Sequence, residues 1–462
     1  MIRKVLVANR GEIAVRIIRA CREMGIETVA VYSEADKDAL HAKLADEAIC
    51  IGPAKLSESY LSMERIISAT IVSGAEAIHP GFGLLSENSR FAKLCEECNI
   101  IFIGPSSDVI AKLGDKQAAR ETMIRAGVPV IPGGDHAVYD EKDAKETADK
   151  VGYPVMIKAV LGGGGKGMRT AKDADEFVKN FAIAQAEAKQ SFGDNAMYIE
   201  HFITRPRHIE FQILADSFGN VIHLGERDCS IQRNHQKMIE EAPSSALSPD
   251  LREKMGEMAV RAAKAAGYVN AGTIEFLLEN DGRFYFMEMN TRIQVEHPIT
   301  EWITGIDLIK EQIRIADGKK LSYTQDQVKI TGHAIEVRIN AERPEDNFLP
   351  CPGTITDLHL PGGKGVRIDS AIYSGYTIPP YYDSMIAKIS VWAKNRNEAI
   401  RKMQSALGEV IIEGVDTNVN YQYALLNNPD FLSGNIDIEF IDRLQKEAAK
   451  RADTEERLLG KD

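Results

Sequence analysis

Two glutamates and an asparagine in the stretch "TIEFLLENDGRFYFMEMNTR" have residue types and a spacing that suit a metal site. Asp281-Gly282 is a strong signal for a two-residue type I′ turn, and the runs on either side of it read as strands. With that turn, Glu275 lies directly opposite Glu288, and Asn290 points to the same face because side chains alternate along a strand. Facing carboxylates destabilise a sheet unless a cation lies between them, and two carboxylates with an amide oxygen suit Mg²⁺ or Mn²⁺.

The other face of this hairpin is apolar and predicts a core surface. It carries Ile274, Phe276, Leu278, Tyr285, Met287 and Met289. The alternative interpretation of the polar face is an exposed surface whose charges are simply hydrated.

"TRIQVEHP" follows the hairpin directly and adds groups that could handle a small oxyanion. Arg292 presents a planar guanidinium that can hold such an anion through two hydrogen bonds. Glu296, four residues further on, is a candidate proton acceptor. The alternative for Arg292 is an ordinary ion pair with the neighbouring glutamates.

"GGGGKGM", residues 162–168, resembles a phosphate-binding loop but fits neither common type. A P-loop requires a glycine, four residues and then Gly-Lys-Ser/Thr, whereas Val160 and Gly167 occupy the two end positions here. A dinucleotide-binding turn should open a helix, but "MRTAKDADEF" reads as a strand and a turn. Two interpretations remain: a flexible flap whose N–H groups approach phosphate oxygens, or a plain hairpin tip. The predicted metal site favours the flap, as a lid over a nucleotide.

Residues 1–114 alternate short apolar runs with helical stretches, which predicts a parallel, doubly wound domain. The expected strands are "KVLVAN", "ETVAVYS", "AEAIHPG" and "IIFIGPS". The first turn, "ANRGEI", lacks the glycines of a dinucleotide site. Further on, "HIEFQIL" places His208, Glu210 and Gln212 on one face, which predicts an antiparallel sheet with one wet side.

Composition excludes several classes of protein. The chain has 462 residues, enough for two to four domains, and its 56 basic and 68 acidic residues give a net charge of −12, which argues against a nucleic-acid-binding surface. The sequence shows neither a signal peptide nor an apolar run of membrane-spanning length. The scattered cysteines predict reduced thiols in a cytoplasmic protein.

The motifs "HPGFGLLSEN", "KAVLGGGGKGMR", "RDCSIQRNHQKMIEEAPS", "EMNTRIQVEHP" and "YYDSMIAK" together resemble those of biotin carboxylases, which are ATP-grasp ligases. The resemblance spans about residues 1–445 and implies an α/β and α+β multidomain fold. It implies a Rossmann-like domain at 1–114, an ATP-grasp domain at 115–332 with a glycine-rich lid at 133–203, a mixed-sheet C-terminal domain at 333–446 and a charged tail at 447–462.

The resemblance also implies roles for individual residues. Those that would contact ATP are Lys116, Lys158, Gly164, Gly165, Glu200, His201, Phe202, Ile203, His208, Gln232, His235, Glu275 and Glu288. Glu275, Glu288 and Asn290 would hold two Mg²⁺ or Mn²⁺ ions, and bicarbonate would bind Lys237, Arg292, Gln294 and Val295. Glu296 would be the general base and Arg338 would stabilise the biotin enolate, while Asp383 matches a residue near the site.

Four positions depart from the usual pattern of the family. Val160 and Leu161 replace smaller residues before the glycines, Asn234 stands where arginine is usual, and His201 stands where lysine is common. None of these changes removes a predicted catalytic group.

Biotin itself would be a substrate carried by another protein. The Met-Lys-Met motif that carries biotin does not occur in the sequence, which predicts a free-standing, homodimeric subunit with separate carrier and carboxyltransferase partners. Acetyl-CoA carboxylase is the preferred assignment, with a split pyruvate or propionyl-CoA carboxylase as the alternative. The competing hypotheses are another carboxylate-activating ATP-grasp ligase and a nucleotide-binding module without turnover. The stretch "TRIQVEHP" together with Arg338 argues against the first, and Lys237, Arg292 and Glu296 argue against the second.

Overall fold

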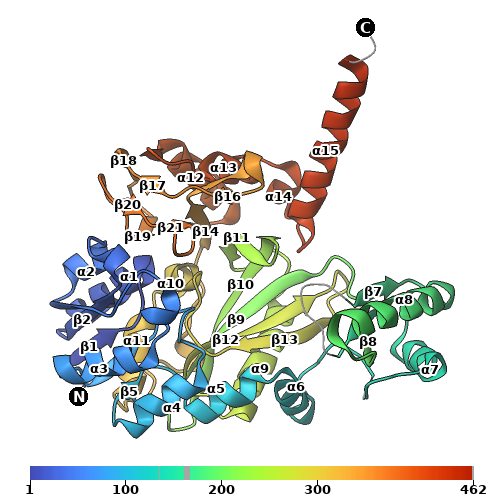
Figure 1. Cartoon of the computed structure of the whole chain (residues 1–462), viewed down its shortest axis with the longest axis horizontal. Helices are drawn as coiled ribbons and strands as arrows, with labels where there is room; N and C mark the ends of the chain where they lie inside the picture. Colours follow the sequence, from blue (N-terminus) through green and yellow to red (C-terminus); the bar gives the residue numbers. More distant parts are fainter. Residues whose placement is uncertain (135, 161–166, 460–462) are drawn as a thin grey trace. The chain divides into compact units, whose positions relative to one another are not determined.

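A computed structural model of the chain describes residues 1–134, 136–160 and 167–459 (Figure 1). Over these residues the chain divides into two compact units. The first comprises Met1–Ala126, Arg207–Phe276 and Glu288–Asp462, and the second comprises Gly127–Pro206 and Leu277–Met287. Among the described helices, we find none with the length and apolar character needed to cross a membrane.

The first unit opens with the predicted parallel sheet, ordered β3-β2-β1-β4-β5. Its strands are β1 (Lys4–Val7), β2 (Glu27–Tyr32), β3 (Glu47–Cys50), β4 (Ala77–His79) and β5 (Ile101–Phe102). The connecting helices are α1 (Gly11–Glu23), η1 (Glu34–Asp36), α2 (Leu40–Leu44), η2 (Leu56–Glu58), α3 (Met63–Ser73), α4 (Ser89–Glu97) and α5 (Ser107–Gly114). Strand β3 was not predicted, because its residues are mostly exposed and form no apolar run.

Alternate residues of β1 enter different cores, as expected for a sheet covered on both faces. Val5 and Val7 pack with α1, whereas Leu6 and Ala8 pack with residues of α3 and α4. Helix α1 forms because its apolar residues repeat at helical spacing, and Ile17 on this stripe is completely buried.

Most of a larger sheet, ordered β13-β12-β9-β10-β11-β14-β21-β19, also belongs to the first unit, whereas the segment Leu277–Met287 of its β12–β13 hairpin is assigned to the second. The strands of this sheet are β9 (Arg207–Ala215), β10 (Val221–Arg233), β11 (Gln236–Ala242), β12 (Asn270–Leu278), β13 (Phe284–Asn290), β14 (His333–Asn340), β19 (Val366–Ser370) and β21 (Met385–Ala393). The central pairs from β9 to β19 are antiparallel, as predicted. Glu240 of β11 lies opposite Glu336 of β14, and Arg338 lies opposite Lys388 of β21.

The remaining elements of the first unit are helices and pairs of short strands. The helices are α6 (Lys116–Arg125), α9 (Pro249–Ala266), α10 (His297–Thr304), α11 (Leu308–Ala316), α12 (Arg396–Glu409), α13 (Val419–Leu426), α14 (Pro429–Ser433), α15 (Phe440–Leu459), η3 (Gln325–Gln327) and η4 (Pro344–Asp346). Short strand pairs are β15 (Glu342–Arg343) with β16 (Leu349–Pro350), β17 (Gly353–Thr354) with β20 (Thr377–Ile378), and β18 (Asp357–His359) with β22 (Ile411–Glu413).

The polar face of β9 is buried, so the prediction of a wet side was wrong. Glu210 and Gln212 are 0% exposed, and His208 is 5% exposed. Helix α10 packs on β10, β11 and β14 on this face, and Arg227 of β10 donates hydrogen bonds to both Gln212 and Thr300 of α10. Buried polar groups persist because partners from distant segments satisfy them.

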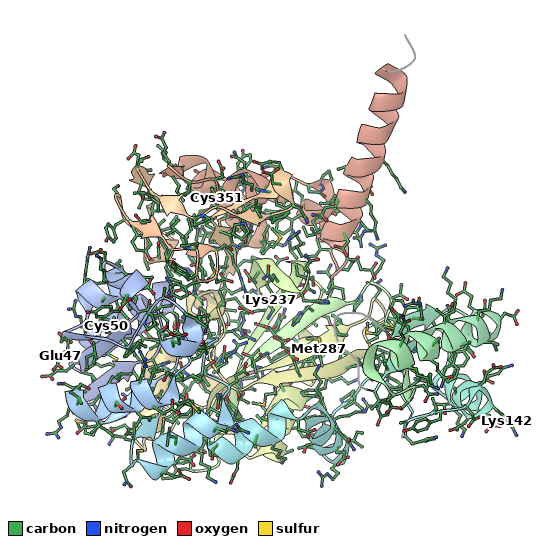
Figure 2. All side chains as sticks on the ribbon, viewed as in Figure 1. Glu47, Cys50, Lys142, Lys237, Met287 and Cys351 are labelled. Carbon is green, nitrogen blue, oxygen red and sulfur yellow. The ribbon has the colours of Figure 1, made fainter. Side chains whose placement is uncertain are left out.

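The hairpin between β12 and β13 has a longer turn than predicted. Glu279 N donates to Arg283 O at 2.8 Å, so the loop encloses three residues, and Asn280 does not face Arg283. Gly282 adopts φ +87°, the left-handed geometry that such a bulged loop requires. On the apolar face, the predicted core residues are buried except Met287, which is 37% exposed (Figure 2).

The second unit is built around an antiparallel sheet ordered β7-β6-β8. Its elements are α7 (Glu141–Val151), β6 (Val155–Ala159), β7 (Met168–Ala171), α8 (Ala174–Phe192) and β8 (Met197–His201). Phe177 and Phe181 of α8 stack and pack on Ile157 of β6. Gly164, Gly165 and Leu161 of the predicted glycine flap lie outside the described residues.

The cysteines form no disulfide in the described part of the chain, in agreement with the prediction of reduced thiols. Cys21, Cys95 and Cys229 are buried, whereas Cys50 is exposed and Cys351 is half-buried (Figure 2).

Candidate active site

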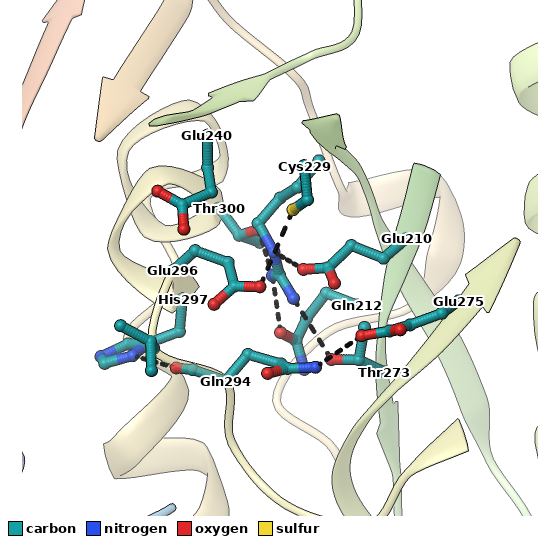
Figure 3. Close-up of polar contacts among 12 residues, drawn as sticks. Glu210, Gln212, Cys229, Glu240, Thr273, Glu275, Gln294, Glu296, His297 and Thr300 are labelled. Carbon is teal, nitrogen blue, oxygen red and sulfur yellow. Dashed lines mark hydrogen bonds and ion pairs between the residues drawn. The ribbon is translucent and has the colours of Figure 1, made fainter. Parts of the chain in front are cut away.

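A cluster of charged side chains lies on one face of the larger sheet, and we call Lys237, Glu210, Glu275 and Glu296 the Lys237 cluster. The Lys237 ammonium donates to Glu210 Oε2 at 2.6 Å, to Glu296 Oε1 at 2.7 Å and to Glu275 Oε1 at 3.1 Å. Figure 3 shows these three glutamates pointing toward one another. They come from β9, from β12 and from the end of the segment 291–296, which we call the 291–296 loop.

Glu296 is ionised in spite of being completely buried. Burial opposes its ionisation, but the charges of Lys237, Arg338 and Arg227 outweigh that effect and hold its pKa well below the usual range. Arg338 Nη2 lies 3.0 Å from Glu296 Oε2, opposite the oxygen that Lys237 contacts. Each carboxylate oxygen of this candidate base therefore has a cationic partner.

Glu275 is the meeting point of several predicted ligands. Asn290 Nδ2 donates to its Oε1 at 2.8 Å, Gln294 Nε2 donates to the same atom at 3.0 Å, and His208 Nε2 lies 3.0 Å from Oε2. Burial opposes ionisation of Glu275, but Lys237 and His208 hold its pKa below the usual range.

Glu288 completes the predicted metal set. Partial desolvation and the negative charge of Glu275 raise the pKa of Glu288, whose side chain is still exposed. A divalent cation would relieve this repulsion, and the carboxylate and amide oxygens of Glu275, Glu288 and Asn290 suit Mg²⁺ or Mn²⁺. The donor atoms of His208, Glu210 and Glu275 also lie within 4.8 Å of one another, but Lys237 already bonds to two of them.

Arg292 is paired with a residue that sequence reasoning did not identify. Its Nε donates to Glu87 Oε2 at 2.9 Å, and the other oxygen of Glu87 accepts the Thr291 N–H at 3.0 Å. Arg292 also donates to Asn290 Oδ1 at 3.1 Å and to Gln294 Oε1 at 3.0 Å. The guanidinium is thus oriented by partners on both sides, including a glutamate from the N-terminal parallel domain.

Arg338 is held between two carboxylates. Its Nε donates to Glu240 Oε1 at 2.7 Å, and its Nη2 reaches Glu296. Glu240 is buried, and burial raises its pKa to about 7 although Arg338 opposes the shift. Glu240 was also missed in the sequence, because its partner lies 98 residues away.

Arg227 of β10 supports the cluster from a buried position. It is 0% exposed and donates to Glu210, Gln212, Thr273 and Thr300. The charged residues at alternate positions of "HIEFQIL" and "GERDCSI" could have indicated this contact in the sequence. Glu210 and Arg227 are paired on neighbouring strands and point to the same face. The Cys229 thiol also faces the cluster, 3.7 Å from Glu296 Oε1.

The other predicted nucleotide-binding residues of the first unit lie on different elements. Lys116 is the first residue of α6, Gln232 is buried near the end of β10, and His235 is exposed. Asn234 and His235 have φ of +49° and +64° and form the tight turn between β10 and β11. Asparagine tolerates this left-handed conformation, which gives the departure at position 234 a physical reason.

In the second unit, Lys158 of β6 forms an ion pair with Glu200 of β8. His201 Nε2 lies 3.5 Å from Glu279 Oε1, and Phe202 N donates to Pro154 O at 2.8 Å. Ile203 is 7% exposed. The structure therefore brings Lys158 together with Glu200, another residue that the resemblance assigns to ATP binding.

Asp383 lies apart from these contacts. Its Oδ1 accepts the Met385 N–H at 2.9 Å, at the start of β21. This local turn is the contact that the structure describes for its carboxylate.

A parallel N-terminal domain is joined here to a buried, cation-rich carboxylate site on an antiparallel sheet, and the matching family models identify the class as an ATP-dependent ligase with an ATP-grasp domain. Residues 1–110 match the family "Biotin carboxylase, N-terminal domain", and residues 336–443 match "Biotin carboxylase C-terminal domain". Residues 115–324 match "Carbamoyl-phosphate synthase L chain, ATP binding domain". The two flanking matches distinguish the chain from a carbamoyl-phosphate synthase.

Relatives that match over nearly their whole length support the same family. The chain is 58% identical to the biotin carboxylase of Nostoc sp. PCC 7120, over 96% of this chain and 99% of that protein. It is 57% identical to biotin carboxylase 1 of Bacillus subtilis, over 96% of this chain and 98% of that protein. A pyruvate carboxylase subunit from Methanothermobacter thermautotrophicus is 55% identical, over 96% and 91% of the two chains. The chain belongs to the biotin carboxylase family.

Solved structures show the same fold. A biotin carboxylase–β,γ-ATP complex from Campylobacter jejuni is 50% identical, with a TM-score of 0.88 over 96% of this chain and 99% of that one. The biotin carboxylase domain dimer of Hydrogenobacter thermophilus 2-oxoglutarate carboxylase, in complex with MgADP, ADP and bicarbonate, is also 50% identical. Its TM-score is 0.85, over 96% and 98% of the two chains.

Proposed function

We propose that the chain carboxylates biotin on a carrier protein, using ATP and bicarbonate, as the first half-reaction of a biotin-dependent carboxylase. The observation that carries the proposal is the pairing of Glu296 with Lys237 and Arg338 at the end of the 291–296 loop. This places an ionised carboxylate beside cationic groups that can hold a small oxyanion.

In this reaction Lys237, Arg292, Gln294 and Val295 bind bicarbonate, and Glu296 accepts its proton. The negative charge of bicarbonate offsets part of the positive charge around Glu296, which raises the proton affinity of that carboxylate. The deprotonated oxygen then attacks the γ-phosphorus of ATP, and the bond to ADP breaks. The products of this step are carboxyphosphate and ADP.

Glu275, Glu288 and Asn290 hold the divalent ions, which offset the charge on the transferring phosphoryl group. Lys116, Lys158, His208, Gln232 and His235 contact ATP, together with Gly164 and Gly165. Glu200, His201, Phe202 and Ile203 contact the adenine. The ion pair between Lys158 and Glu200 supports this proposal, since it holds the lysine on the same sheet as the adenine-binding segment.

Carboxyphosphate then breaks down to CO₂ and phosphate. The phosphate removes the proton from N1 of biotin, Arg338 stabilises the negative oxygen of the enolate, and N1 attacks CO₂ to give carboxybiotin. Arg338 suits this role because Glu240 and Glu296 fix its guanidinium from two sides. Water must be excluded because carboxyphosphate hydrolyses, and residues 133–203 act as the lid that excludes it.

Within the whole enzyme, we assign residues 1–114, 115–332 and 333–446 to its three domains. The protein is a cytoplasmic homodimer that works with separate carrier and carboxyltransferase proteins. Acetyl-CoA carboxylase is the preferred enzyme, and a split pyruvate carboxylase is the second candidate because one relative is named as a subunit of that enzyme.

Steady-state ATP turnover tests this function. ADP release is expected to require bicarbonate and to rise when free biotin is added. ADP release that ignores both compounds contradicts the proposal, and release that needs another carboxylate points to a different ATP-grasp ligase.

A further inference from the structure

Lys388 is a buried lysine outside the Lys237 cluster that contacts the backbone of the 291–296 loop. It lies on β21, its side chain is 0% exposed, and its Nζ donates to the Val295 carbonyl at 2.5 Å. Its Nζ also lies 3.1 Å from Glu12 Oε1 on α1. One ammonium therefore joins the C-terminal part of the sheet, the parallel domain and the loop.

The charge of Lys388 is balanced locally. We call Lys388, Glu12, Glu336 and Asp369 the Lys388 cluster, because all three carboxylates act on the ammonium and raise its pKa although burial opposes this. Asp369 lies directly opposite Lys388 on β19 and is itself held by Arg367 at 2.7 Å. The lysine thus stays charged while completely buried, and a charged donor makes a stronger hydrogen bond than a neutral one.

The hydrogen bond from Lys388 matters because its acceptor is the Val295 carbonyl oxygen. The Val295 carbonyl and the Glu296 nitrogen share one planar peptide group. A donor on that carbonyl therefore fixes the orientation of the backbone from which Glu296 projects. Glu296 has φ −80° and ψ 11° and immediately precedes α10, so a rotation of this peptide would move both its carboxylate and the start of the helix.

We infer that Lys388 is a positioning residue for the proposed bicarbonate site, because its ammonium fixes the Val295–Glu296 peptide through the Val295 carbonyl. It does not touch the reacting atoms, and it acts by holding Val295 and Glu296 where bicarbonate and its proton must meet. The inference rests on the proposed function, since it assigns Lys388 to the geometry of that same site.

The test is Lys388→Met in the full-length chain, with bicarbonate-dependent ATP turnover measured at varied bicarbonate and at varied ATP. Losing a hydrogen bond from a charged donor corresponds to roughly a tenfold rise in the bicarbonate KM. The ATP KM is expected to stay within about twofold, because no contact joins Lys388 to a predicted nucleotide residue in the part of the chain that the structure describes.

Arg396→Met is the matched control. Arg396 is another partly buried cation of the same unit, bonded to buried Glu241 at 2.6 Å, and it contacts none of the residues of the 291–296 loop in the described structure. This variant loses a comparable ion pair and is expected to keep the bicarbonate KM within about twofold. A similar rise in both variants would mean that general destabilisation is responsible, and it would overturn the inference.

Lys388→Met combined with Glu12→Gln guards against a failure to fold. The double variant replaces both members of the Lys388–Glu12 contact together, so no single partner is left buried without the other while the donor to Val295 is still removed. A raised bicarbonate KM in this folded variant, with the ATP KM unchanged, supports the inference. An unchanged bicarbonate KM in a folded Lys388 variant overturns it but leaves the proposed function standing. A wild-type chain without bicarbonate-dependent turnover overturns both.

Discussion

The Lys237 cluster and the Lys388 cluster each surround one buried lysine with three carboxylates, yet they differ in the cations that face those carboxylates. In the first, cations hold the pKa values of Glu275 and Glu296 below the usual range, whereas burial raises that of Glu210. In the second, burial raises the pKa of Glu12 to about 7 and that of Glu336 well above the usual range, whereas Arg367 and Lys388 lower that of Asp369 although burial opposes this.

The difference follows from the number of cations that each carboxylate meets. Glu296 meets Lys237, Arg338 and Arg227, whereas the positive charges that act on Glu12 are those of Lys388 and Arg367. An ionised carboxylate can accept a proton, and a protonated one cannot. Glu296 is therefore the better suited of these two carboxylates to accept a proton.

Removing the candidate base gives the largest expected effect. Glu296→Gln is expected to lower bicarbonate-dependent ATP turnover by about 10²- to 10⁴-fold, which is the usual contribution of a general base. Steady-state ADP release measures this. Glu241→Gln is the control, because Glu241 is equally buried but pairs with His333 and Arg396. Equal losses in both variants would contradict the role of Glu296.

The second prediction concerns the guanidinium beside the cluster. Arg292→Ala is expected to lower turnover by about 100-fold through lost orientation of bicarbonate, with little change in the dissociation constant of ATP. Calorimetric titration with ATP separates the two quantities. A collapse of ATP affinity would show instead that Arg292 is structural or binds the nucleotide.

The third prediction tests the metal set. Glu275→Gln is expected to raise the Mg²⁺ concentration for half-maximal turnover by roughly tenfold, because a ligand loses its charge. Titration of turnover with Mg²⁺ at saturating ATP measures the change. Unchanged metal dependence would exclude Glu275 as a ligand.

The smallest effect is one of stability, and its sign distinguishes Glu12 of the Lys388 cluster from Glu241, which lies outside both clusters. The folded chain holds the Glu12 proton up to about pH 7, whereas the unfolded chain releases it near pH 4.5, so this residue makes the fold less stable as pH rises through that window. Glu12→Gln is expected to remove a loss of roughly 1–3 kcal/mol between these pH values.

Denaturant unfolding at several pH values measures this slope. Glu241 provides the opposite sign, because its partners lower its pKa to about 2 although burial opposes this. Its contribution is present above pH 4.5 and is lost as pH falls toward 2. If wild type and Glu12→Gln lose stability equally between pH 4.5 and 7, the protonation assigned to the Lys388 cluster is wrong.

Local patterns in the sequence predicted much of the fold. The apolar runs and the helical stripe of α1 predicted the parallel sheet, and the hairpin prediction correctly placed Asn290 beside Glu275. The turn has three residues rather than two, so the predicted register that set Glu275 directly opposite Glu288 was not correctly derived. Asn280-Asp281-Gly282 is compatible with either turn, because both need a left-handed residue that Gly282 supplies.

What the sequence did not predict depends on contacts between distant segments. Glu87 and Arg292 are 205 residues apart, and Val295 and Lys388 are 93 apart. The polar face of β9 looked solvated because its cationic partners lie on other strands. The family resemblance supplied roles for Lys237 and Arg338, but it did not indicate the supporting residues Arg227, Glu240 and Lys388.

The most direct test of the account is the transfer of labelled carboxyl from bicarbonate to free biotin. The purified chain is mixed with ATP, Mg²⁺, labelled bicarbonate and biotin, and carboxybiotin is measured against ADP. The account predicts labelled carboxybiotin that depends on ATP and is lost in Glu296→Gln. Label that never exceeds the background without enzyme, while ADP accumulates, would contradict it.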